Sequence, residues 1–213
     1  MDSPEPAAPV LAEGAHHLSR HLSLDDQRMV IAVCLAHGAE PAGFYTPVVR
    51  GGGTMSVQMM CLGRHWNALT YTYENVRGDV DGLRPQPLPH QLALLAARAA
   101  EAAGFTFHPD ICIVNHYSAT SRMGLHQDKD ESPASLAAGE PVVSFSIGDT
   151  ARFLFGGLRR RDPVQTLLLE SGDVFVFGGA ARLRYHGVTR ILPGTAPIEL
   201  GLAGRLNLTF RKF

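Results

Sequence analysis

Helical periodicity marks the first half of the chain. Between Ser23 and about His37, apolar residues recur at helical spacing, and Ser23 with Asp26 has the pattern of a capping box. A second helix is predicted from about Pro89 to Ala103, where an alanine- and leucine-rich run is followed by Gly104. These two helices are expected to flank the body of the protein.

The second half has the pattern of a β protein. One strand is predicted early, at residues 54–61, and the stretch 64–89 favours irregular structure. After residue 104, short β-type runs alternate with glycine-rich turns and no helix-length spacer separates them. The predicted strands there are 111–117, 142–147, 151–155, 165–170, 173–177 and 205–211. The expected fold class is therefore mainly β with flanking helices, as a sandwich or barrel.

Length, net charge and cysteine content limit the number of domains, the kind of partner and the cellular compartment to be expected. The 213 residues predict a single domain, 1–213, and the 20 acidic and 19 basic residues give a net charge of −1. A polyanionic partner would have to be met by a local basic patch. Three scattered cysteines favour reduced thiols and a cytoplasmic protein. We expect no membrane span, and residues 1–15 have the composition of a loose leader rather than a signal peptide.

The chemistry begins with an HxD tripeptide. On an extended backbone His126 and Asp128 face the same way, and His186 follows the predicted strand 173–177 as a third candidate ligand. Two imidazoles and one carboxylate that leave other positions open form the facial triad of non-haem iron(II) oxygenases. HxD alone is a weak signal, and a core histidine bonded to a carbonyl is the alternative for His186.

The last predicted strand alternates strictly between apolar and polar residues. Its polar face carries Arg205, Asn207, Thr209 and Arg211. One interpretation is a half-buried strand with this face in water. The other directs the polar row into a barrel mouth, where two guanidinium groups bind a small dianion. Asn115 and Tyr117, two residues apart on the strand 111–117, can donate hydrogen bonds to the same dianion.

Five short motifs together closely resemble the bacterial AlkB family, the Fe(II)- and 2-oxoglutarate-dependent dioxygenases that repair alkylated nucleic acids. The resemblance extends from about Gly51 to Arg211, and HQDKDE and RxNLTFR are its most specific parts. The motifs are Asn115-His116-Tyr117, residues 125–131 (LHQDKDE), Phe155-Gly156-Gly157-Leu158, Tyr185-His186-Gly187 and residues 205–211 (RLNLTFR).

The resemblance implies a role for each matching residue. The implied iron ligands are His126, Asp128 and His186. The implied 2-oxoglutarate contacts are Asn115, Tyr117, Arg205, Asn207 and Arg211, with the first arginine on the distal carboxylate and the last on the carboxylate nearer the metal. Dioxygen is the second co-substrate.

The family also implies an architecture. The catalytic core, residues 105–213, is expected to be a double-stranded β-helix, or jelly roll. Residues 46–104 are expected to form a nucleotide-recognition lid and a helix, and residues 1–45 an N-terminal extension and helix.

Substrate contacts are assigned to the lid and to the loops beside the triad. Trp66, the only tryptophan, is implied to stack on the damaged base against His126, although core packing is the alternative. The TYTY element leaves open whether Tyr71 or Tyr73 contacts substrate. Further candidates are Asp130 and Glu131, which can favour cationic bases, and Arg160 in a basic turn; Arg182 and Arg184 are also basic and could bind phosphates.

The function implied is oxidative removal of N-alkyl groups, as in 1-methyladenine and 3-methylcytosine, with release of an aldehyde, succinate and CO2. The expected partner is alkylated DNA, single- or double-stranded, with RNA left open, and no membrane or obligate protein partner is expected. Two alternatives remain: a 2-oxoglutarate oxygenase acting on a protein or small molecule, and a non-catalytic jelly-roll binding module.

Overall fold

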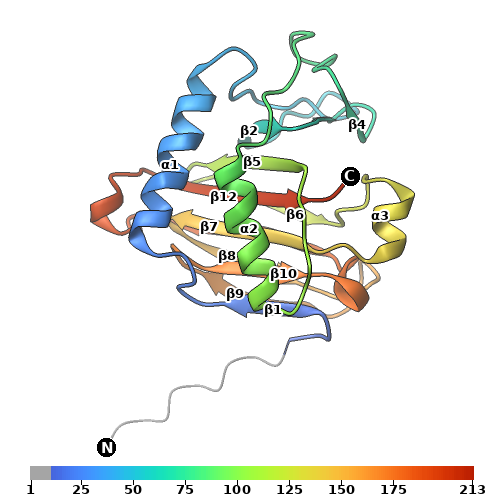
Figure 1. Ribbon diagram of the computed structural model, residues 1–213, viewed down its shortest axis with the longest axis vertical. Helices are drawn as coiled ribbons and strands as arrows, with labels where there is room; N and C mark the ends of the chain where they lie inside the picture. Colours follow the sequence, from blue (N-terminus) through green and yellow to red (C-terminus); the bar gives the residue numbers. More distant parts are fainter. Residues whose placement is uncertain (1–10) are drawn as a thin grey trace, which may run out of the picture.

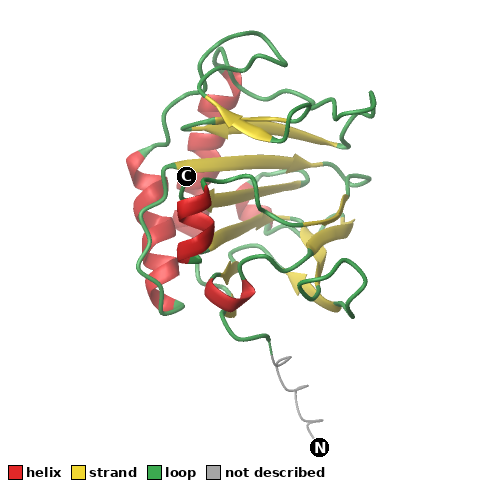
Figure 2. Ribbon diagram, turned by 90° about the vertical axis from the view of Figure 1, so that its right-hand side faces the viewer, coloured by secondary structure: helices red, strands yellow, loops and turns green. Residues whose placement is uncertain are grey.

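A computed structural model describes residues 11–213, which form two facing antiparallel sheets, a small hairpin and helices on one side (Figures 1 and 2). The large sheet has the order β1 (Ala15–Leu18), β10 (Val174–Phe177), β7 (Val142–Gly148), β12 (Arg205–Arg211), β5 (Ile111–Tyr117) and β2 (Val57–Leu62). The second sheet has the order β6 (Met123–His126), β11 (His186–Leu192), β8 (Thr150–Phe155) and β9 (Gln165–Leu169). This is the expected jelly-roll class.

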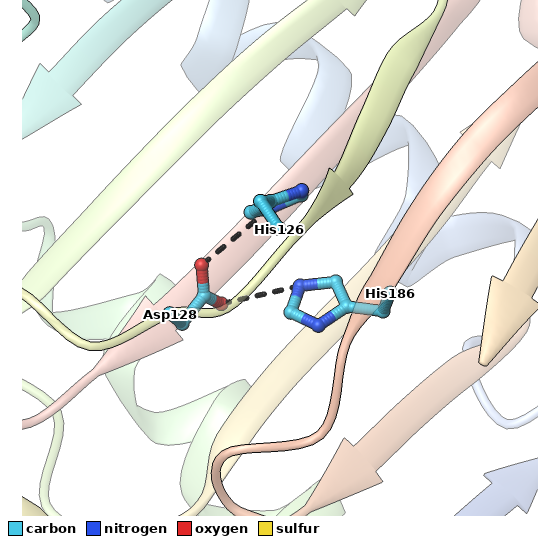
Figure 3. A group of neighbouring side chains, drawn as sticks. All are labelled: His126, Asp128 and His186. Atoms are coloured by element: carbon cyan, nitrogen blue, oxygen red, sulfur yellow. Dashed lines mark ion pairs between the residues drawn. The ribbon is translucent and has the colours of Figure 1, made fainter. Parts of the chain in front are cut away.

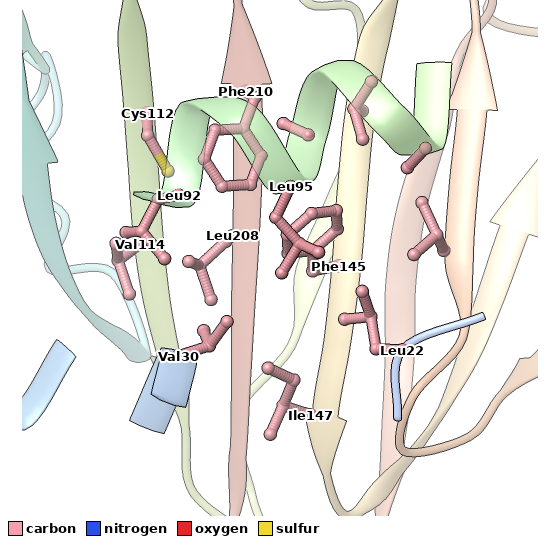
Figure 4. Packing of buried hydrophobic residues seen from close by; sticks show 14 of the residues in the cluster. Leu22, Val30, Leu92, Leu95, Cys112, Val114, Phe145, Ile147, Leu208 and Phe210 are labelled. Atoms are coloured by element: carbon pink, nitrogen blue, oxygen red, sulfur yellow. The ribbon is translucent and has the colours of Figure 1, made fainter. Parts of the chain in front are cut away.

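Two helices cover the outer face of the large sheet, α1 (Leu24–Ala39) and α2 (His90–Ala102) (Figure 1). The predicted capping box is present, since the Ser23 hydroxyl accepts from the Asp26 amide at 3.1 Å and the Ser23 amide donates back to the Asp26 carboxylate. Leu95 of α2 packs with Phe145, Leu208 and Phe210 of the sheet (Figure 4). The apolar face of β12 therefore belongs to this helix-covered core.

A second core fills the space between the two sheets. Its largest members are aromatic: the rings of Phe153 and Phe175 lie 5.0 Å apart, as do those of Phe155 and Phe175. Beside this aromatic cluster, the polar row of β12 also faces the inter-sheet space, and all seven residues of the strand are buried. The interpretation that placed this polar face in water is wrong.

Residues 46–104, which we expected to form a lid and a helix, contain regular structure that the sequence pattern did not predict. Residues 64–89 include a two-stranded hairpin, β3 (His65–Asn67) and β4 (Thr72–Glu74), which pairs Trp66 with Tyr73. His65 ties the hairpin to the following loop, because its ring forms a hydrogen bond with the carboxylate of Asp79 at 2.5 Å. Three-residue strands give too little alternation to be recognised, so the sequence pattern of this segment favours irregular structure.

The other predicted elements are confirmed with small shifts at their ends. The structure adds α3 (Pro133–Ala138), two 3-10 turns, η1 (Gly179–Ala181) and η2 (Ile198–Leu200), and the strands β1, β6 and β11. The first ten residues of the predicted leader lie outside the described residues. All three cysteines are buried and free. None of the helices within residues 11–213 combines the length and the hydropathy that a membrane crossing requires.

The N-terminal strand is fastened to the large sheet by one carboxylate. Asp173, 1% exposed, accepts hydrogen bonds from the ring of His17 and from the amide of Arg20, both at 2.8 Å. Burial would raise the pKa of Asp173, but these bonds and one from the Glu170 amide hold it below its ordinary value. This clamp was not expected from the sequence.

Candidate active site

Two neighbouring strands of the smaller sheet bring the HxD motif and the distant histidine together. His126 ends β6, His186 begins β11, and the two residues are direct partners in the antiparallel register. The Nε2 atoms of His126 and His186 lie 3.7 and 3.6 Å from the two carboxylate oxygens of Asp128 (Figure 3). The three candidate ligand atoms lie within 4.8 Å of one another, which is the spacing of a mononuclear metal site.

Both imidazole rings are oriented by the main chain. The Nδ1 atom of His126 bonds the carbonyl of Gly124 at 2.9 Å, and that of His186 bonds the carbonyl of Arg184 at 3.0 Å. A carbonyl accepts only, so Nδ1 carries a proton in each ring, and Nε2 is left as the nitrogen that faces Asp128. A histidine whose second nitrogen is fixed in this way is prepared to bind a metal ion.

The electrostatics of the triad also suit a cation. Burial would raise the pKa of Asp128, but Arg211 and the two imidazoles outweigh it and hold that pKa well below its ordinary range. Burial lowers the pKa of His186 to about 4. At neutral pH the site therefore presents a carboxylate and a neutral imidazole, the protonation states that metal ligation requires.

An inner pocket opens from the triad between the two sheets. Every residue predicted for the dianion lines it: Asn115, Tyr117, Arg205, Asn207 and Arg211. Ser144 and Ser146 of β7 support the pocket, because the Asn207 amide donates to the Ser144 hydroxyl at 2.8 Å and Arg205 donates to Ser146 at 3.1 Å. The sequence analysis missed these serines, although their i, i+2 spacing in an otherwise apolar strand was a signal.

Arg205 is a buried cation that forms no ion pair with a carboxylate of the described residues. It is 1% exposed, and its Nε and Nη1 atoms have no hydrogen-bond acceptor among residues 11–213. Burial lowers the pKa of Arg205 to about 10, so the group remains a cation at neutral pH. The Oδ1 atom of Asn115 is likewise buried without a hydrogen-bond partner in the described chain. A buried cation without a carboxylate partner fits a pocket that receives an anionic ligand.

A wider cleft of about 670 Å³ lies on the other side of the triad. It contains every predicted substrate residue, and its wall includes His126 and Asp128. Those residues are Trp66, Tyr71, Tyr73, Asp130, Glu131 and Arg160. The candidate metal triad thus lies where a narrow cationic pocket and a wider aromatic cleft meet.

The lid hairpin is joined to the metal-ligand loop by two aromatic side chains. Trp66 Nε1 donates to Asp130 Oδ2 at 2.8 Å, and the Tyr73 hydroxyl donates to Glu131 Oε1 at 3.4 Å. Tyr73 also accepts from Arg211 Nη1 at 3.2 Å, whereas Tyr71 is 43% exposed and stands edge-on to Trp66. The two tyrosines are therefore placed differently, with the Tyr73 hydroxyl among charged groups and Tyr71 at the rim.

The predicted basic residues also differ in position. Arg160 reaches the cleft and donates to the carbonyl of Leu125 at 2.8 Å. Arg182, a basic loop residue that could have bound phosphates, is 3% exposed and forms an ion pair with Glu131, so it is not available to a phosphate. Arg184 donates to the carbonyl of Gly156.

Sequence and structure comparisons agree with this geometry. The family described as the 2OG-Fe(II) oxygenase superfamily matches residues 14–211. The chain belongs to this superfamily. Membership implies iron(II), 2-oxoglutarate and dioxygen, and the triad and the unpaired Arg205 fit the first two of these groups.

Similar members of the superfamily carry specific names. DNA N(6)-methyladenine demethylase ALKBH1D of Arabidopsis thaliana is 42% identical over 96% of this chain, which spans about half of that relative's length. Alpha-ketoglutarate-dependent dioxygenase AlkB of Escherichia coli is 43% identical over 82% of this chain and 79% of its own. The solved structure of OsALKBH1 matches with a TM-score of 0.90 and 42% identity, over 96% of this chain and 99% of that one.

Proposed function

We propose that the protein is an AlkB-type dioxygenase that uses iron(II) and 2-oxoglutarate to remove N-alkyl groups from bases in DNA. The observation that carries the proposal is the position of the triad between two different pockets. One is narrow and contains Arg205, a buried cation without a carboxylate partner among residues 11–213, which suits a dicarboxylate co-substrate. The other is wider and is lined by aromatic and charged side chains, which suits a base held outside its stack.

The pocket residues bind and orient the reactants. His126, Asp128 and His186 would hold the iron, and Arg205 and Arg211 would bind the two carboxylates of 2-oxoglutarate. Iron(II) held there, with 2-oxoglutarate and dioxygen, would supply the oxidation of N-CH3 to N-CH2OH, with 2-oxoglutarate converted to succinate and CO2. The N-CH2OH group then breaks down to the N-H base and formaldehyde, so carbon, oxygen and electrons balance.

The open cleft supports a cationic base as substrate. Trp66 offers an aromatic face beside His126, and its indole is fixed by the bond to Asp130. Glu131 is paired with Arg182 and Arg211, so its charge is compensated, whereas Asp130 bonds only a neutral indole in that network. The Asp130 carboxylate therefore favours the cations 1-methyladenine and 3-methylcytosine over uncharged bases.

The names of the relatives allow a second substrate. N6-methyladenine, in the printed name of the Arabidopsis relative, is uncharged and gains nothing from Asp130 by Coulomb attraction. On this physical ground the cationic lesions are the proposed substrates and N6-methyladenine is the competitor. RNA and double-stranded DNA remain further substrates to compare, and a cytoplasmic location is proposed from the reduced cysteines.

The test is incubation in air with iron(II), 2-oxoglutarate, ascorbate and one of three oligonucleotides. These carry a single 1-methyladenine, 3-methylcytosine or N6-methyladenine, and mass spectrometry follows the loss of a methyl group. Iron- and 2-oxoglutarate-dependent loss from the two cationic bases is the expected result. Succinate formation with no demethylation of any oligonucleotide would instead support an oxygenase for a protein or small molecule. Metal binding without succinate would support the non-catalytic binding module.

A further inference from the structure

Arg182 is a buried arginine that lines neither pocket. Through Glu131, it connects the loop of Asp128 to Arg211. Arg182 follows the 3-10 turn η1, four residues before His186, and its side chain is 3% exposed. Its Nη1 atom donates to the main-chain carbonyl of Asp128 at 2.5 Å, and its Nη2 atom lies 2.8 Å from Glu131 Oε2. One planar guanidinium thus joins two residues of the same loop, three positions apart.

The chain of contacts continues through Glu131 to β12. The second carboxylate oxygen of Glu131, Oε1, lies 3.2 Å from Arg211 Nε and accepts from the Tyr73 hydroxyl. Arg211 in turn places Nη2 2.8 Å from Asp128 Oδ2. Two carboxylates and two guanidinium groups therefore form one buried, charge-balanced cluster beside the triad. Its members are Asp128, Glu131, Arg182 and Arg211.

The arrangement gives Arg182 a different task from that of a stabilising ion pair. A buried ion pair adds little net stability, because desolvation offsets the attraction. Arg182 can instead fix the orientation of Asp128. It binds the main-chain carbonyl of Asp128, while the Asp128 carboxylate remains directed at the histidines. Glu131, fixed on one side by Arg182, holds Arg211 on the other side independently of Asp128.

We propose that Arg182 is a positioning residue for both the metal and 2-oxoglutarate. It fixes the loop backbone at Asp128 and, through Glu131, the guanidinium of Arg211. The inference rests on the proposed function, since it takes the triad as the iron site and Arg211 as a co-substrate contact. Partners that orient metal ligands typically contribute 10–100-fold in metal affinity or activity. Loss of Arg182 should therefore weaken metal and co-substrate binding.

The test measures binding by titration calorimetry with Mn(II) and then 2-oxoglutarate, without nucleic acid or turnover. Arg182→Met is expected to raise both dissociation constants by roughly 10–100-fold. Arg182→Lys keeps a charge for Glu131 but cannot bridge both partners, so intermediate values are expected. Arg182→Met combined with Glu131→Gln removes the buried carboxylate that has lost one of its two cationic partners. It should regain thermal stability relative to Arg182→Met without regaining the affinity for 2-oxoglutarate.

Arg77 provides a matched control. It is also 3% exposed, donates to a carbonyl (Gly43, 2.9 Å) and pairs with a carboxylate (Asp81, 3.0 Å), but in the lid. Arg77→Met should lower the melting temperature and leave both dissociation constants unchanged. Unchanged dissociation constants in folded Arg182→Met, or equal losses in Arg77→Met, would overturn the proposal. Wild-type protein that binds 2-oxoglutarate but demethylates nothing would contradict the proposed function and leave this comparison valid.

Discussion

Arg211 Nη2 lies 2.8 Å from Asp128 Oδ2, so the last strand of the large sheet contacts the metal-ligand loop of the smaller sheet directly. Asp128 and its neighbours raise the pKa of Arg211 well above its ordinary value despite burial, which keeps the guanidinium charged. The inner pocket and the triad therefore share one wall. A ligand carboxylate that binds Arg211 necessarily lies next to the metal site.

Arg205 is predicted to provide affinity for 2-oxoglutarate. Arg205→Met removes the unpaired buried cation and should raise the dissociation constant of 2-oxoglutarate strongly, because a charged hydrogen bond contributes roughly 1.5–3 kcal/mol. Mn(II) binding should remain, since Arg205 contacts no triad residue by hydrogen bond or ion pair within the described chain. Calorimetric titration of both ligands checks this. Wild-type affinity for 2-oxoglutarate would contradict the assignment of the pocket.

Trp66 is predicted to hold the base. Stacking of a base on an aromatic ring contributes roughly 1–3 kcal/mol, so Trp66→Ala should greatly weaken binding and turnover of a methylated oligonucleotide. Trp66→Phe keeps an aromatic face and loses only the bond to Asp130, so a smaller loss is expected. Succinate formation without oligonucleotide should persist in both variants. Equal turnover of the oligonucleotide by Trp66→Ala and wild type would exclude the stacking role.

Asp130 is predicted to favour positively charged bases over uncharged ones. Asp130→Asn keeps an oxygen for the Trp66 indole and removes the negative charge, so the two roles separate. A charge pair at about 4 Å contributes roughly 1–4 kcal/mol between water and a protein surface. The ratio of kcat/KM for 1-methyladenine to that for N6-methyladenine should fall by about tenfold or more. A constant ratio would assign Asp130 to orienting Trp66 alone.

The sequence predicted most of the site because β-strand alternation was enough to group its residues. The i, i+2 spacing placed Arg205 with Asn207, and Asn115 with Tyr117, on common faces, and all four line the inner pocket. Pairing across strands is a long-range property, however. The direct pairing of His126 with His186 follows from neighbouring strands that the local pattern did not identify.

The role of Arg182 could not be read from its neighbours in the chain. It lies among basic residues and resembles a phosphate contact in sequence, yet its partners are 51 and 54 positions away. The Tyr73 hydroxyl is a similar case, since both Glu131 and Arg211 are distant in sequence. Buried charge clusters assembled from several loops leave no periodic signal.

The clamp on the N-terminal strand predicts a pH-dependent stability. Because the folded pKa of Asp173 is below its ordinary 3.8, its contribution is present above that pH and is lost as the pH falls through the folded pKa. Asp173→Asn should lower the free energy of unfolding by about 1–3 kcal/mol at pH 7, and the difference from wild type should shrink below pH 3.8.

Urea unfolding at several pH values provides the measurement for this clamp. Asp25→Asn is the control, because its ion pair with Arg28 has a 91% exposed carboxylate and should contribute little. An Asp173→Asn variant as stable as wild type at pH 7 would show that the strand is held by its main-chain pairing alone.

The central claim is that the His126, Asp128 and His186 site couples 2-oxoglutarate oxidation to repair of a cationic base. The most direct measurement counts succinate, formaldehyde and repaired base in one reaction with a 1-methyladenine oligonucleotide. We predict one formaldehyde for each repaired base, accompanied by at least one succinate, in the wild type. Asp128→Ala should form none of the three while it remains folded. Formaldehyde and repaired base at wild-type levels in Asp128→Ala would contradict the account.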